Sequence, residues 1–165
     1  TLTAEGIPLG PTGTVFDPRW FASYTRVSNL TYNNLTPSDH YMSDSISLGR
    51  GFSDYDEARL GLDVLVRSAP VRVYVAHRRQ GQGDYRFPAP EPSTYTTVPE
   101  FLSGTVMTVN RVGVSGGALL PFGFDVTGDL GANAITNADH VPGVSATRFA
   151  ARVQIAWVPD RMARR

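Results

Sequence analysis

Apolar and polar residues alternate almost without interruption over the last third of the chain. In the first of two segments the apolar positions are Phe122, Phe124, Val126, Leu130 and Ala132, with Gly128 in the remaining place. In the second segment they are Phe149, Ala151, Val153, Ile155 and Trp157. A period of two places the apolar side chains of a strand on one face, and the Asn, Asp, Pro and Gly residues between the segments are typical of turns. The pattern predicts a long β-hairpin with one apolar and one polar face.

A second hairpin is indicated by the same alternation in residues 60–66 and 71–78, with a turn at 68–70. Shorter strands are expected at 20–28, 45–51 and 102–114, and no segment has a helical period. We therefore expect an all-β fold, in which antiparallel sheets form a β-sandwich or a partly open barrel. The predicted core consists of Leu60, Leu62, Val64, Val66, Val71, Val73, Val75, Phe122, Phe124, Val126, Val153 and Ile155.

The length of 165 residues fits a single β domain, 1–165, with three parts. Residues 1–19 contain too many Pro and Gly residues for a central strand, so they are expected to form an extended arm. The β core should cover 20–158, and 159–165 form a basic tail. The stretch 78–99 reads as a long Pro-rich loop, of the kind that binds something or covers a sheet edge.

Composition excludes several classes of function. The formal net charge is zero, so there is no electrostatic case for nucleic acid. Cysteine is absent, which excludes disulfide scaffolds and thiolate metal sites. All fifteen basic residues are arginine, a bias that suggests a GC-rich bacterium, with selection for bidentate arginine contacts as the alternative. The absence of cysteine fits an exported bacterial protein. By analogy with small subunits of bacterial membrane complexes we expect it in the periplasm or cell envelope, associated with a membrane, with the outer membrane as the alternative.

No set of residues has the spacing of a known catalytic, cofactor or metal site. His40, His77 and His140 are scattered, and the acidic run around Asp54 lacks the spacing of a calcium loop. We interpret that run as a solvated turn. The Asn- and Asp-rich loop 133–140 is interpreted as a structural turn, while its capacity for a metal or sugar ligand stays open. We therefore expect a protein that is not an enzyme and has no cofactor.

Two segments resemble hairpins of bacterial outer-membrane β-barrel proteins of the capsule-assembly type. They are LGLDVLVRSAPVRVYVAHRRQGQGD (60–84) and FGFDVTGDLGANAITNADHVPGVSATRFAARVQIAW (122–157). The resemblance implies strands whose residues face lipid and lumen in turn, aromatic residues near the membrane interfaces, and short turns opposite long loops.

Three functions from different classes follow. The first is a non-enzymatic accessory subunit, extrinsic to a bacterial membrane-associated complex, for example an energy-transducing one, and stabilising it. Its partners would be other protein subunits, with the membrane surface as a further contact. The residues expected to contact partners are Ile7, Leu9, Val15, Phe16, Tyr85, Phe87 and Tyr95. The second is an outer-membrane β-barrel or a fragment of one, and the third is a carbohydrate-binding β-sandwich.

Overall fold

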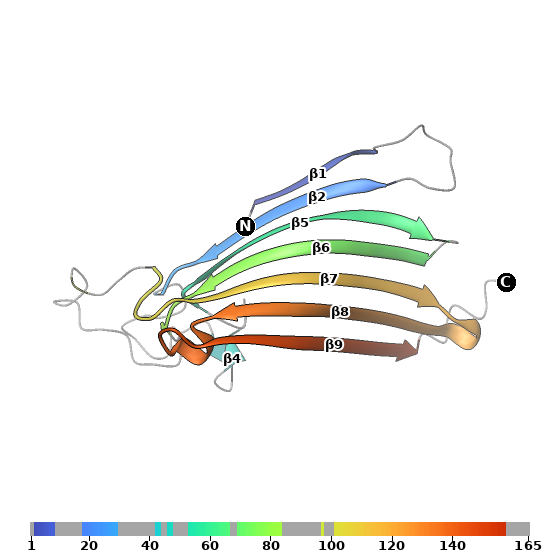
Figure 1. Cartoon of the computed structure of the whole chain (residues 1–165). Helices are drawn as coiled ribbons and strands as arrows, with labels where there is room; N and C mark the ends of the chain where they lie inside the picture. The colour runs from blue at the N-terminus through green and yellow to red at the C-terminus, as the bar shows by residue number, and fades with distance from the viewer. Residues whose placement is uncertain are drawn as a thin grey trace.

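The fold is a single antiparallel meander sheet that is not closed, shown in Figure 1. The computed structural model describes residues 2–8, 18–29, 42–43, 46–47, 53–66, 69–83, 97 and 101–157. The seven strands, in their order across the sheet, are β1 (Leu2–Pro8), β2 (Arg19–Val27), β5 (Tyr55–Val66), β6 (Ala69–Gln80), β7 (Met107–Leu119), β8 (Phe124–Thr136) and β9 (Ser145–Trp157). A separate pair is formed by β3 (Met42–Ser43) and β4 (Ile46–Ser47), and two short 3-10 turns are η3 (Pro121–Gly123) and η4 (Ala138–His140). The expected all-β antiparallel class is confirmed.

Both predicted hairpins are present. Strands β5 and β6 pair without a register shift from Tyr55–Gln80 to Val66–Ala69, and β8 and β9 pair from Phe124–Trp157 to Thr136–Ser145. The first turn is tighter than predicted, because Ala69 and Pro70 already belong to β6. Strand β7 begins at Met107, later than the expected 102, and continues to Leu119. The predicted strand at 45–51 corresponds in part to β4.

The register across the sheet defines two faces. Residues paired across neighbouring strands point to the same side, so the row Leu62, Val73, Val114, Leu130 and Ala151 lies on one of them. We call this side the apolar face. The opposite side is the polar face, which carries Arg59, Asp63, Arg72, Tyr74, Arg111, Ser115, Asp129, Asn133, Arg148 and Arg152.

The predicted core is wrong, although the alternation behind it is right. Nine of its twelve residues are exposed and the other three, Val64, Val71 and Val126, are half-buried. The buried residues of the strands lie instead mainly on the polar face, namely Phe21, Thr25, Val27, Tyr55, Tyr74, Ala76 and Ile135. In the described ranges only the two-residue strands β3 and β4 form a second sheet, so the apolar face has no sheet to pack on.

The prediction of an amino-terminal arm without a strand is wrong for part of that segment. Residues 2–8 form the edge strand β1, paired with β2, since the dense Pro and Gly punctuation starts only at Pro8. Of the residues predicted to contact partners, Ile7 lies in β1. Leu9, Val15, Phe16, Tyr85, Phe87 and Tyr95 lie outside the described residues, as do the tail 159–165 and most of the loop 84–99.

Candidate site on the polar face

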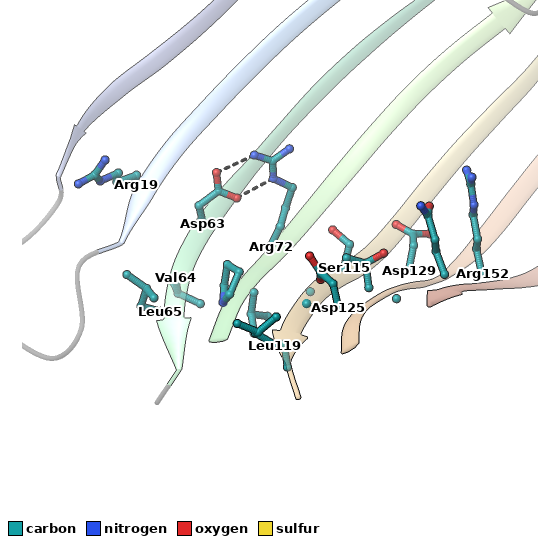
Figure 2. A pocket seen from close by; sticks show the side chains of 18 residues that line it. Arg19, Asp63, Val64, Leu65, Arg72, Ser115, Leu119, Asp125, Asp129 and Arg152 are labelled. Atoms are coloured by element: carbon teal, nitrogen blue, oxygen red, sulfur yellow. Dashed lines mark hydrogen bonds and ion pairs between the residues drawn. The ribbon is translucent and has the colours of Figure 1, made fainter. Parts of the chain in front are cut away.

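An open hollow of about 950 Å³ lies on the polar face, near the ends of β5 and β7. Figure 2 shows its charged side chains, which come from β2, β5, β6, β8 and β9. It is lined on one side by Asp63 and Arg72 and on the other by Asp125, Asp129 and Arg152. Segments more than fifty residues apart in the chain thus contribute to one surface.

One side of the hollow is held by a bidentate ion pair. Arg72 donates from Nε and Nη2 to the two carboxylate oxygens of Asp63, at 2.6 and 2.7 Å. The residues are directly opposite each other on β5 and β6, so the strand register brings the two groups together. The same guanidinium stacks on the ring of Phe21, 4.1 Å from its centroid. A planar cation with two fixed hydrogen bonds is positioned more firmly than a lysine would be.

The middle of the polar face carries a network centred on Asp129. Tyr74 donates its hydroxyl hydrogen to Asp129 Oδ2 at 2.6 Å, and Arg111 pairs with Oδ1 of the same carboxylate. Arg111 also donates from Nε to the Tyr74 hydroxyl at 2.8 Å and from Nη1 to Asn133 at 3.1 Å. Three strands, β6, β7 and β8, are therefore linked through side chains as well as through their backbones.

Glycines beneath this network allow the large side chains to lie flat on the sheet. Phe21, Gly61, Tyr74, Gly113 and Gly131 form one continuous row across five strands. A Cβ atom at Gly113 would lie 2.5 Å from Tyr74 Cζ, and one at Gly61 would lie 2.6 Å from Phe21 Cε1. The missing side chains thus make room for the aromatic rings, which are the best-buried large groups of the sheet.

Two charged groups in the hollow have no partner among the described residues. Arg152 is opposite Asp129 in the register, but both oxygens of that carboxylate are already bound by Tyr74 and Arg111. Asp125, farther along β8, likewise makes no hydrogen bond or ion pair within that part of the chain. These groups leave the hollow with both a cation and an anion available to a polar solute.

At the other end of the sheet the acidic run forms a clamp, so its interpretation as a solvated turn is wrong. Asp54 is fully buried, with a left-handed backbone at φ 57°. Its carboxylate accepts hydrogen bonds from the backbone N–H groups of Gly83, Leu102 and Ser103, at 2.9, 2.5 and 2.9 Å, and from Ser103 Oγ at 2.6 Å. Four donors satisfy the buried carboxyl oxygens, and they tie together three loops distant in sequence.

Asp56 forms a second polar contact nearby, on the apolar face but beyond its apolar residues. Arg79 donates to both of its oxygens, at 3.0 and 2.5 Å, and Tyr24 donates its hydroxyl hydrogen at 3.2 Å. Burial of Asp56 raises its pKa, but the hydrogen bond and positive charge of Arg79, with the Tyr24 hydroxyl, outweigh that effect and lower the pKa overall. This pair marks the point where the apolar part of the face ends.

The Asn- and Asp-rich loop is used to build a turn. Asn137 donates from Nδ2 to the Val106 carbonyl at 2.9 Å and accepts from the backbone N–H of Gly143 at 3.0 Å. His140 Nδ1 lies 2.7 Å from the Thr105 carbonyl oxygen. Both residues and Asp139 have positive φ angles, which suits the Asn and Asp side chains. The loop is therefore anchored to the segment that precedes β7.

The hollow offers charged and polar binding groups. Within the described ranges no three His, Asp or Glu side chains are placed to hold a metal ion. Of the histidines in those ranges, His77 contacts Asn110 and His140 contacts Thr105, and neither lines the hollow. The alternation of the two hairpins does not show that Asp63 meets Arg72, or that Asp129 meets Tyr74 and Arg111. The sequence did carry one signal for these contacts that its analysis did not use. Gly61, Gly113 and Gly131 each lie two positions from a charged residue of the polar face.

The described part of the chain contains no helix of the length and apolar character that crossing a membrane requires. No family model, no curated protein and no solved structure matches this chain.

Proposed function

We propose that the sheet forms part of a bacterial outer-membrane β-barrel, with its apolar face against lipid and its polar face toward an aqueous interior. A single observation carries this proposal. Most of the large apolar side chains of the apolar face are exposed, from 40% for Val114 to 86% for Phe149, while the aromatic residues Phe21 and Tyr74 of the polar face are 6% exposed. A water-soluble sandwich has the opposite arrangement, because it buries its apolar face between two sheets.

The dimensions of the strands support a lipid contact. Strands β5 to β9 have 12 or 13 residues each, and a tilted strand needs roughly 9–11 residues to cross the hydrocarbon core. Polar residues, among them Asp56, Arg79 and His77, follow the apolar residues at one end of the face. At the other end lie Phe124 and Trp157, paired in the register. An apolar band bordered by polar and aromatic residues is the pattern expected at a membrane.

The polar face supports the other half of the proposal. In β2 and β5 through β9 it carries seven arginines, Arg19, Arg59, Arg72, Arg78, Arg111, Arg148 and Arg152, and four acidic residues, Glu57, Asp63, Asp125 and Asp129. Charged side chains on the lipid side of a strand cost up to about 2–4 kcal/mol each, so this face belongs in water. The arginine excess would favour anionic solutes near the hollow. The proposal assigns the chain no catalytic step.

The accessory subunit is the second candidate, favoured by the same exposed face. A large apolar surface on a soluble protein marks a site of protein or membrane contact, and an apolar surface on a partner subunit could cover it. The carbohydrate-binding sandwich has less support. Its aromatic platform would need Tyr or Trp side chains beside a groove, but none is among the described residues that line the hollow.

Adjacent cysteine labels test the lipid contact. The chain has no native cysteine, so Val114→Cys on the apolar face and Ser115→Cys on the polar face would each carry one environment-sensitive fluorophore. In lipid vesicles we expect nitroxide-labelled acyl chains to quench the label at 114 and to leave the label at 115 unquenched. Equal quenching at both positions contradicts the proposal. Complete release of the native chain from membranes by alkaline carbonate would favour the accessory subunit.

A further inference from the structure

The edge strand β9 has no strand beside its outer edge among the described residues. It pairs with β8 through thirteen consecutive residues without a register shift. Twelve of its thirteen residues are exposed. Its outward backbone N–H and C=O groups therefore form a long, regular row available for pairing.

The opposite edge differs. Strand β1 has seven residues, its register shifts between Glu5 and Pro8, and it ends on a proline, which has no N–H to donate. Short length, irregular register and proline are devices that stop an edge from accepting another strand. Strand β9 contains no proline, no lysine and no irregularity. Of the two edges, β9 is the one suited to further pairing.

The side chains of β9 indicate what would pair there. Phe149, Val153 and Ile155 alternate with Arg148, Arg152 and Gln154, and the strand has no acidic residue. Arg148 pairs with Asp139 at 3.0 Å, but Arg152 has no partner within the described ranges, because Asp129 is already bound by Tyr74 and Arg111. A carboxylate directly opposite Arg152 on a neighbouring strand would supply the missing charge.

We infer that β9 binds an antiparallel strand from a different polypeptide segment, with apolar residues at alternate positions and an acidic residue opposite Arg152. Pairing at β9 deepens the proposed function and rests on it, because every strand of a closed barrel has a neighbour on both sides.

A second copy of the chain fits this edge poorly. Two β9 strands side by side would gather their arginines on one face with no acid between them. All six pairings in the main sheet are antiparallel, so β1 and β9 run in the same direction. A copy in the same orientation could therefore offer its β1 only as a parallel strand, the slightly less stable arrangement.

The test uses the full chain in detergent micelles and a designed thirteen-residue peptide of alternating valine and threonine. The peptide carries an aspartate at its centre and a cysteine two positions later, on the same face. If the aspartate lies opposite Arg152 in an antiparallel strand, the cysteine lies opposite residue 150. The chain therefore carries Ala150→Cys, and the control is Thr127→Cys, an exposed polar-face position on β8, which already has neighbours on both sides.

We expect a disulfide between peptide and chain at position 150 and not at 127. Replacing the peptide aspartate by arginine should weaken binding about fivefold, and Arg152→Glu in the chain should reverse that preference, as cross-strand charge pairs do. Equal cross-linking at 150 and 127, or an affinity independent of both charges, overturns the inference. A disulfide joining two chains at position 150, with none to the peptide, overturns it in favour of a second copy. These cross-linking results do not depend on the quenching of the labels at 114 and 115, so the two proposals can fail separately.

Discussion

The two faces of this sheet differ in how much of their packing the chain itself supplies. On the polar face, Tyr74, Arg111 and Asp129 bind one another, and Phe21 and Tyr74 lie over glycines. On the apolar face, Val153 and Phe149 contribute large side chains that remain 69% and 86% exposed. The internal packing is thus complete on one side only. Apolar residues stabilise a fold only when something removes them from water, so the apolar face depends on its surroundings and the polar face does not.

The largest expected effect tests whether the apolar face contacts lipid. In lipid bilayers, Val153→Arg should lower the free energy of unfolding by about 2–4 kcal/mol, because it places a charge in hydrocarbon, and Val153→Asp by less. Gln154→Arg and Gln154→Asp, one position along on the polar face, should change it by less than about 0.5 kcal/mol. Denaturant titration in vesicles measures all four variants.

Folding in water gives the contrary outcome for the same residue. If the wild-type chain folds without lipid or detergent and Val153→Asp abolishes that folding, Val153 is a core residue of a sandwich. If the substitutions at 153 and 154 change the free energy of unfolding equally, the two faces do not differ in their surroundings.

A steric test comes next, and it uses one glycine from each face. Gly113→Val would place its Cβ 2.5 Å from the Tyr74 ring on the polar face, which should cost about 1–3 kcal/mol through overpacking. The control is Gly128→Val on the apolar face, where the nearest atom to the new Cβ, the Arg152 carbonyl oxygen, is 3.8 Å away. Thermal unfolding in detergent should show a lower midpoint for the first variant alone. An equal decrease in the unfolding midpoint for Gly128→Val would mean that other groups cover the apolar face.

The hydroxyl of Tyr74 gives a smaller and more local effect. Tyr74→Phe keeps the ring over Gly113 but removes the hydrogen bonds with Asp129 and Arg111. We expect a loss of about 1 kcal/mol, typical for hydrogen bonds within a network. Combining Tyr74→Phe with Asp129→Asn should cost less than the sum of the two changes, because both break the same contact. Strict additivity would show that the two groups do not interact.

The smallest effect concerns the polar end of the apolar face. Because Arg79 lowers the pKa of Asp56 below its ordinary value of 3.8, the charged form stabilises the fold fully above that value. The contribution is lost as the pH falls through the lowered pKa. Its size should be below about 1 kcal/mol, since Arg79 is 44% exposed. Asp56→Asn should reduce the acid dependence of unfolding, and an unchanged acid dependence in this variant would contradict the role of the pair.

The parts of the fold that sequence reasoning predicted are those that depend on near neighbours in the chain. The strands β5, β6, β8 and β9 and their pairing follow from a period of two and from turn residues. Strand β1 was not expected, because the prolines after Leu2–Pro8 concealed a short edge strand. The buried carboxylate of Asp54 was interpreted as solvated, since its donors Leu102 and Ser103 lie 48 and 49 residues away.

Alternation alone was enough to sort the side chains into two faces, because the direction of each side chain along a strand is a local property of the backbone. Which face became buried was decided by the assembled sheet. Its register placed Tyr74 beside Asp129, 55 residues away, and set Gly113 under the ring. Burial depends on what lies across the face and on contacts between distant strands, and neither is encoded in the period of any single strand.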